Sequence, residues 1–197
     1  MKKLFLIATM MVATLSANAQ NETGKWSIKP MAGVNFATMT KTDDTSMRIG
    51  FTAGAEFAYG IAKNFELSFG ALYSQQGVKG KTQSKGIKVT GTYKLDYINI
   101  PILANYYIAP GFAIKAGIQP GFNVTKKFEA EASGVSTSVN LDEGVKGFAL
   151  SVPVGLSYEF SNFAIDARYN WGVTDAFDDI KTKHSYFTLT LGYKIPL

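Results

Sequence analysis

The sequence predicts an all-β fold, an eight-stranded antiparallel up-and-down transmembrane β-barrel. Three observations support this prediction. Eight segments alternate between apolar and polar residues with the period of two that is typical of β-strands. Short and long connections follow one another in turn between these segments. Small residues dominate the polar face, and aromatic residues bracket the apolar face at both ends.

The segment 147–174 shows the alternation most clearly. Ser161 and Asn162 divide it into two arms, and an apolar residue stands at every second position of each arm. This pattern predicts an antiparallel hairpin with a two-residue turn. Each arm has about the length of a tilted membrane-crossing strand, which is roughly 9 to 11 residues. The apolar positions of the first arm are Phe148, Leu150, Val152, Val154, Leu156, Tyr158 and Phe160.

The first 19 residues have the features of a secretory signal peptide. Lys2 and Lys3 precede a short apolar run, which ends at the small-residue site Ala17-Asn18-Ala19. The run is shorter than the roughly 18 apolar residues that a membrane-spanning helix needs, which disfavours an uncleaved anchor. We therefore expect a signal peptide at residues 1–19 and one barrel domain at residues 20–197.

Composition limits the classes of partner and cofactor. Removal of Lys2 and Lys3 from the 20 basic residues leaves 18, against 15 acidic residues. No basic stripe with interleaved aromatic residues accompanies this small excess, so we expect no nucleic-acid partner. The chain has no cysteine, which excludes disulfide bonds and a lipid-modified cysteine. The sequence shows no metal-ligand spacing, phosphate loop or nucleotide fingerprint, so we expect no metal and no cofactor.

The expected strands are connected by turns and links of unequal length. The strands are 26–40, 48–59, 65–76, 93–108, 112–128, 147–160, 163–174 and 185–197. The short turns are 60–64, 109–111 and 161–162, and the longer polar links are 41–47, 77–92, 129–146 and 175–184. Outer-membrane barrels show this asymmetry, with the short turns in the periplasm. Both chain ends fall on the short-turn side, which predicts periplasmic termini.

The residues on the two faces distinguish a membrane barrel from a soluble barrel or sandwich, which also alternate. Glycine and serine crowd the polar face, and these small residues suit the interior of a narrow barrel. Aromatic residues form the two girdles expected of a wall that spans a bilayer. The girdle near the short turns contains Trp26, Tyr59, Phe65, Tyr107, Phe112, Phe160, Phe163 and Tyr193. The girdle nearer the links contains Phe51, Tyr73, Phe122, Phe148 and Trp171.

The final strand and several motifs resemble those of a known family. An apolar residue stands at every second position from Phe187 to Leu197, as in the terminal strand that the barrel-assembly machinery reads. The signal end ANAQ, the opening KPMAGVNF (29–36) and the segment YINIPIL (97–103) resemble the PorT-like outer-membrane β-barrel family of Bacteroidota. The architecture is similar to small eight-stranded barrels of the OmpA/OmpX type. The resemblance covers residues 20–197 and implies an integral outer-membrane protein; one member type takes part in protein secretion.

Eight charged residues share the inward face of the expected strands, most of them near the short-turn end. A barrel of this size has room inside only for side chains, and a buried charge without its partner costs roughly 3 to 5 kcal/mol. We therefore expect a paired, charged plug that closes the lumen, with a proton or ion relay as the alternative. The residues are Lys29, Glu56, Glu66, Lys115, Glu159, Asp166, Arg168 and Lys194.

Catalytic candidates gather around the only histidine, His184, which stands beside Ser185 and close to Asp178. Some eight-stranded outer-membrane barrels are lipid-modifying enzymes that use histidine, serine and an acid, so these three residues are candidates. Adjacent strand residues point to opposite faces, so His184 and Ser185 could pair only if the chain bends. An ordinary polar loop end is the competing interpretation.

The second long link is basic, whereas the third and fourth links are acidic. Its lysines would suit the phosphate groups of lipopolysaccharide. Pairing with the acidic links, or plain solvation, explains them as well. The lysines of this candidate contact are Lys79, Lys81, Lys85 and Lys88.

Together these patterns favour an integral outer-membrane barrel without enzymatic activity. We expect a structural or interaction component of the envelope, or a partner in a transport or secretion assembly. The alternative is an outer-leaflet lipid-modifying enzyme of the eight-stranded barrel type. The expected partners are outer-membrane lipid and lipopolysaccharide, the barrel-assembly machinery during biogenesis, and an envelope or secretion protein.

Overall fold

The computed structural model describes residues 23–40, 45–84, 87–132, 135–141, 144–177 and 182–197. The expected signal peptide lies outside these residues. The described chain forms eleven strands and contains no helix that is long and apolar enough to cross a membrane. The strands are β1 (Trp26–Met39), β2 (Thr45–Ala62), β3 (Phe65–Ser84), β4 (Ile87–Asn99), β5 (Ile102–Ala109), β6 (Phe112–Ala132), β7 (Val135–Asn140), β8 (Phe148–Phe160), β9 (Phe163–Asp175), β10 (Lys183–Tyr193) and β11 (Ile195–Pro196).

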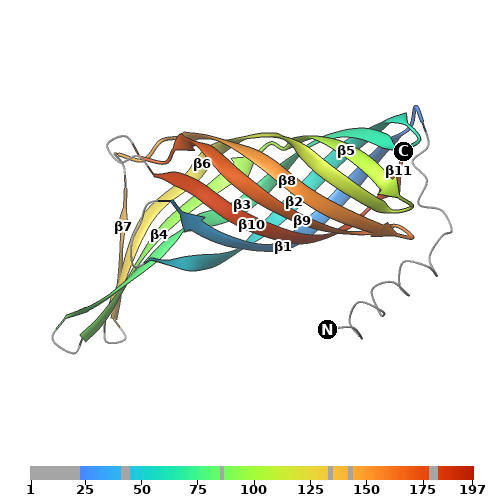
Figure 1. The fold of residues 1–197 in the computed structure, drawn as a ribbon. Helices are drawn as coiled ribbons and strands as arrows, with labels where there is room; N and C mark the ends of the chain where they lie inside the picture. The colour runs from blue at the N-terminus through green and yellow to red at the C-terminus, as the bar shows by residue number, and fades with distance from the viewer. Residues whose placement is uncertain (1–22, 41–44, 85–86, 133–134, 142–143, 178–181) are drawn as a thin grey trace, which may run out of the picture.

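The strands form a closed antiparallel barrel with eight strand positions around the ring, which confirms the predicted fold class (Figure 1). β4 and β5 occupy one position in succession, and β10 and β11 occupy another. The break between β4 and β5 falls at Pro101, which has no N–H to donate but still accepts a bond from Gly70 N at 3.1 Å. β1 closes the ring by pairing with β10 and β11.

Exposure alternates along the wall, as the period of two requires. In β9, exposed Phe163, Ile165 and Trp171 alternate with buried Asp166 and Arg168. The apolar side chains therefore point outward toward lipid, and the polar side chains point into the lumen. The short turns and the C-terminus lie together at one end of the barrel (Figure 1).

Two of the expected links are instead paired strands that extend beyond the barrel. β3 continues to Ser84 and pairs with β4 as far as Ser84↔Ile87, so most of 77–92 is a hairpin rather than a polar loop. β6 continues to Ala132 and pairs with β7 inside the expected link 129–146. Figure 1 shows this outer sheet, which we define as β7 with the parts of β3, β4 and β6 beyond the barrel. Backbone pairing needs no lipid-facing stripe, so the apolar alternation fades there while the strands persist.

Candidate functional site: the closed lumen

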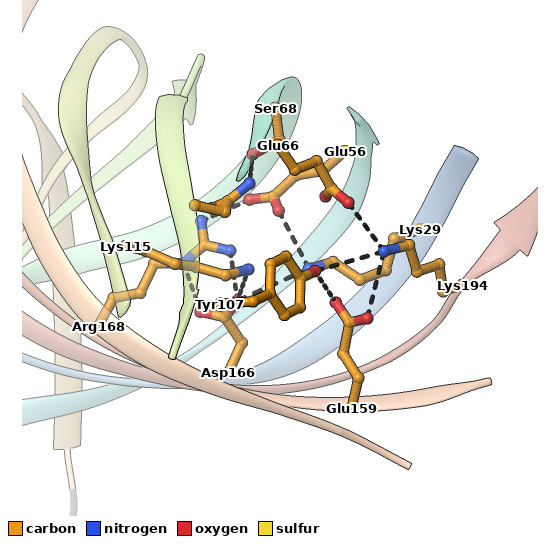
Figure 2. Close-up of polar contacts among 11 residues, drawn as sticks. Lys29, Glu56, Glu66, Ser68, Tyr107, Lys115, Glu159, Asp166, Arg168 and Lys194 are labelled. Atoms are coloured by element: carbon orange, nitrogen blue, oxygen red, sulfur yellow. Dashed lines mark hydrogen bonds and ion pairs between the residues drawn. The ribbon is translucent and has the colours of Figure 1, made fainter. Parts of the chain in front are cut away.

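Eight charged side chains lie inside the barrel toward its short-turn end. Figure 2 shows the contacts among them. We call these eight residues and Tyr107 the ionic layer. Acids and bases are equal in number among them, and each of the eight has an opposite charge within 4 Å. The members are Lys29, Glu56, Glu66, Tyr107, Lys115, Glu159, Asp166, Arg168 and Lys194.

Asp166 on β9 is the centre of the ionic layer. Its Oδ2 accepts hydrogen bonds from Lys115 Nζ at 2.6 Å and from Arg168 Nη2 at 2.9 Å, and its Oδ1 accepts one from Arg168 Nε at 2.5 Å. Arg168 Nη1 also donates to Glu56 Oε1 at 2.5 Å. Lys29 Nζ lies 3.4 Å from Glu56 Oε2 and 3.6 Å from Asp166 Oδ2. One buried carboxylate therefore joins three bases.

The second part of the ionic layer surrounds Lys194, between β10 and β11. Its Nζ lies 2.9 Å from Glu66 Oε2, 3.2 Å from Glu159 Oε2 and 3.4 Å from Tyr107 OH. Tyr107 OH donates to Glu159 Oε1 at 2.8 Å. The assignment of Tyr107 to the outer girdle was wrong, because the residue is only 9% exposed and its hydroxyl joins the lumen charges. Its position two residues from the inward Asn105 was the sequence signal that could have found it.

The pairing register of the strands and the small residues beside them determine where the long charged side chains of the ionic layer lie. Lys29 stands directly opposite Glu56 on the neighbouring strand. A Cβ added at Gly155 would lie 2.9 Å from Arg168 Cγ, and one at Gly192 would lie 2.9 Å from Lys29 Cγ. The glycines of the inward face therefore leave the space that the charged side chains occupy.

An uncharged polar layer follows the ionic layer along the lumen. Asn35 Nδ2 donates to Ser74 Oγ at 2.7 Å, and Thr188 Oγ1 donates to Asn35 Oδ1 at 2.8 Å. Beside them, Tyr186 OH accepts hydrogen bonds from Gln119 Nε2 at 2.5 Å and from Asn99 Nδ2 at 3.1 Å. Side chains from strands around the ring thus bridge the middle of the barrel.

A cluster of buried apolar side chains, which we call the apolar cap, lies at the link end of the barrel. Its buried members come from the strands and from the chain on either side of β8 and β9, and the sequence analysis did not identify this cluster. Val145 and Phe177 form an isolated antiparallel bridge, and Lys146 N donates to Ala176 O at 3.0 Å, which ties the two links together. The members of the cap are Met39, Val78, Leu95, Tyr97, Val145 and Ala176.

His184 and Ser185 lie in β10, which begins at Lys183, so His184 is part of the wall and not a loop end. A register shift between Lys183 and Ser185 leaves both His184 and Ser185 buried. His184 Nε2 lies 3.0 Å from Tyr97 OH, whereas Ser185 Oγ is hydrogen-bonded to Tyr169 OH. The two candidate side chains therefore have different partners. The third candidate, Asp178, lies outside the described residues.

A buried ion pair in the wall was also missed by the sequence analysis. Arg48 Nη1 lies 3.0 Å from Asp96 Oδ1, and Tyr73 OH donates to Asp96 Oδ2 at 2.9 Å. The β2–β3 register breaks between Met47 and Thr52, and Arg48 bonds the carbonyl of Gln76 in this interval. No local pattern connects residues 48 positions apart, so the sequence carries no signal for this pair.

The basic link lies in the outer sheet. Lys79 is half-buried on β3, whereas Lys85 and the side chains of Lys81 and Lys88 lie outside the described part. Nearby, Lys94 pairs with Glu129, and its hydrogen bond and charge hold the pKa of Glu129 below the usual value. A hollow of about 540 Å³ adjoins this region, lined by Asn123, Val124, Thr125, Lys126, Lys127, Asn140 and Leu141.

Across the described residues, no group of three or more histidine, aspartate or glutamate side chains is arranged to hold a metal ion. The acids of the ionic layer are instead bonded to lysine and arginine. The chemistry that this arrangement supports is mutual neutralisation inside a closed barrel.

Comparison with known proteins agrees with the observed fold. The family model of the outer membrane protein beta-barrel domain matches residues 18–178. Ail, the attachment invasion locus protein of Yersinia pestis, solved with the heparin analogue sucrose octasulfate, is 17% identical with a TM-score of 0.51; the match covers 88% of this chain and 100% of Ail. Neisserial surface protein A is 16% identical with a TM-score of 0.51, over 86% of this chain and 96% of that one.

At these identities the two solved structures support the fold alone. No curated protein matches the chain. The family model spans most of the chain and includes β1 to β9, and β10 and β11 then complete the barrel by pairing with β1. The chain therefore belongs to the outer membrane protein beta-barrel domain family and is an integral outer-membrane barrel.

Proposed function

We propose that this barrel has no enzymatic activity and acts as a structural or interaction component of the envelope, or as a partner in a transport or secretion assembly. The observation that supports this proposal is that three successive layers of buried side chains occupy the lumen: the ionic layer, the uncharged polar layer and the apolar cap. Neither the ionic layer nor the apolar cap leaves its groups available for a substrate. The outer sheet, in contrast, presents polar residues beyond the barrel, which suits contact with other molecules.

Finer features of the proposal follow from sequence motifs and from the position of the turns. We assign the chain to the PorT-like group of Bacteroidota on the motifs KPMAGVNF and YINIPIL. A cleaved signal peptide, periplasmic termini and short turns in the periplasm would place the outer sheet on the cell surface. There Lys79 and its neighbouring lysines would meet lipopolysaccharide phosphates.

Conductance tests the closed lumen. We expect the purified protein to give no large, steady single-channel conductance in planar bilayers, because paired side chains fill a barrel of this width. A large, steady conductance would overturn the proposal.

The orientation of the barrel has its own test. An epitope tag inserted at 109–111 should be hidden on intact cells and become accessible after the outer membrane is permeabilised. Surface labelling of this tag on intact cells would show that the short turns face outward and would overturn the proposed orientation.

The enzyme alternative has a separate test. Tyr97 and Tyr169 hold His184 and Ser185 individually, which supports a structural role for both residues. His184→Ala should therefore leave the envelope lipid profile of cells unchanged, as should the matched Ser185→Ala variant. Loss of one lipid species in the His184 variant, with normal barrel levels in the outer membrane, would instead establish the enzyme.

A further inference from the structure

β7 is the outermost strand of the outer sheet, and one of its edges is open. It pairs with β6 along its whole length, and the described chain provides no other partner for it. β8 follows β7 in the chain, but its pairing with β6 extends only as far as Phe122↔Phe148. Residues 136–140 are exposed. An open edge of this kind can pair with a strand of another chain.

The hydrogen-bond pattern shows which residues face the open edge. Leu141 N donates to Lys126 O at 2.9 Å, so these two residues form a hydrogen-bonded pair at the end of the β6–β7 ladder. Such pairs alternate along an antiparallel ladder, so Val139 and Thr137 also direct their backbone groups toward β6. Ser136 and Ser138 therefore direct their backbone N–H and C=O groups away from β6, into the open edge.

The sequence of β7 is complementary to itself in the antiparallel sense. The residues 135–139 read VSTSV, which is the same in both directions. A second copy centred on Thr137 places threonine opposite threonine and Ser136 opposite Ser138. The backbone groups of both serines face the open edge, so each Ser136–Ser138 pair can exchange two hydrogen bonds. The central threonines then form a non-hydrogen-bonded pair, whose side chains lie closest together.

Charge also favours a second copy as the occupant. Strand edges that avoid association usually carry lysine, proline or a bulge. β7 carries no charged residue and no proline, so two copies meet without like-charge repulsion. Val139 is 57% exposed at this edge, and the antiparallel pair would cover part of it.

We propose that β7 is a self-association edge, at which two copies join their outer sheets by antiparallel β7–β7 pairing centred on Thr137. The interface is isologous, because each copy contributes the same five residues around a two-fold axis. The proposal rests on the proposed function only in placing the outer sheet outside the bilayer. The conductance and lipid tests above do not depend on dimerisation, so failure of one proposal is distinguishable from failure of the other.

Cysteine cross-linking tests the predicted register, because the natural chain has no cysteine. Thr137→Cys places two thiols opposite each other at the two-fold axis. Val139→Cys has similar exposure and lies on the same strand, but its two copies would be four residues out of register, beyond the Cα separation of about 7 Å that a disulfide allows. Mild oxidation of the full barrel in outer-membrane fractions should therefore link Thr137→Cys and not Val139→Cys. Equal linkage of both variants, or none with Thr137→Cys, would overturn the proposal.

Charge exchange at the same position tests whether the pairing is direct. Thr137→Lys and Thr137→Glu each place like charges opposite one another, so each purified variant should be monomeric by light scattering. An equimolar mixture should restore a dimer, because each pair then joins lysine to glutamate. Restoration also shows that both variants are folded. Dimeric single variants would show that the two copies associate at another surface. A mixture that remains monomeric would show that β7 does not pair with itself. Either result would overturn the proposal.

Discussion

The two ends of the lumen are filled by different kinds of side chain. At the short-turn end, the ionic layer joins charged side chains on neighbouring and opposite strands through hydrogen bonds such as Lys115 Nζ to Asp166 Oδ2 at 2.6 Å. At the other end, the apolar cap excludes water by contact among residues such as Leu95 and Val145, which are 0% and 5% exposed. The ionic layer depends on the presence and geometry of each bonded partner. The apolar cap depends on how completely its side chains fill the available volume.

This difference predicts how each end responds to substitution. A charge in a low-dielectric interior is stable only with its partner, so removal of one group penalises those that remain. An apolar contact carries no such penalty beyond the lost area and the cavity left behind. The ionic layer lies on paired strands except for Lys194, whereas Val145 and Ala176 of the cap lie outside the strands. We therefore expect the larger single-site effects at the short-turn end.

Asp166→Asn should have the largest effect. It removes the carboxylate that bonds Lys115 and Arg168, and leaves Lys29, Lys115 and Arg168 around Glu56. Uncompensated buried charge of this kind costs roughly 3 to 5 kcal/mol. Urea unfolding of the refolded barrel in detergent measures the loss in the free energy of unfolding.

The matched control removes a base together with the acid. Lys115→Met combined with Asp166→Asn should lose less free energy of unfolding than the sum of the two single variants, because fewer charges remain unpaired. Strictly additive losses would show that Lys115 and Asp166 do not compensate each other. Substitutions in the ionic layer would then lower the free energy of unfolding independently of one another, as expected for the apolar cap.

Leu95→Ala tests the apolar cap. The residue is completely buried, and leucine-to-alanine changes in protein cores cost roughly 2 to 5 kcal/mol. We expect about 2 to 3 kcal/mol, near the lower limit, because Val145 and Ala176 lie outside the strands, and the cost falls where neighbouring residues can shift into the cavity. Leu67→Ala, on the lipid-facing side of β3, is the control and should cost less. A loss for Leu95→Ala above that for Asp166→Asn would reverse the comparison.

The wall of the barrel and its inward charges were accessible to sequence reasoning, because a period of two separates lipid-facing from inward positions. Asp166 and Arg168 stand two residues apart on the inward face of β9, and the same parity holds for Lys115 on β6. What this reasoning could not supply is the partner of each charge. Partners such as Glu56 and Arg168 are 112 residues apart and meet only once the ring has closed.

The apolar cap and the outer sheet were not accessible in the same way. Alternation is visible only where one face meets lipid, and the hairpin of β3 and β4 carries glycine, threonine and lysine beyond the barrel. The cap combines Leu95 with Val145 and Ala176, which lie inside the links 129–146 and 175–184 that were expected to be polar. The position of an aromatic residue is also hard to predict from the sequence, because the same ring can lie in a girdle or in the lumen.

Tyr107→Phe is the smallest change, and it tests this ambiguity directly. The variant keeps the ring and removes the hydroxyl that donates to Glu159 Oε1 at 2.8 Å and lies 3.4 Å from Lys194 Nζ. Hydrogen bonds to charged groups contribute roughly 1.5 to 3 kcal/mol. We expect about 1 to 2 kcal/mol, because Lys194 continues to neutralise Glu159 after the hydroxyl is lost.

Tyr106→Phe provides the matched control on the next residue. Tyr106 is 46% exposed on the outer face, so loss of its hydroxyl should change the free energy of unfolding much less. Both variants remove one oxygen from the same strand, so the difference between them isolates the lumen contact. If Tyr107 were a girdle residue, the two losses would be equal. A larger loss at Tyr107 would show that directional bonds, and not ring packing, stabilise the short-turn end of the barrel.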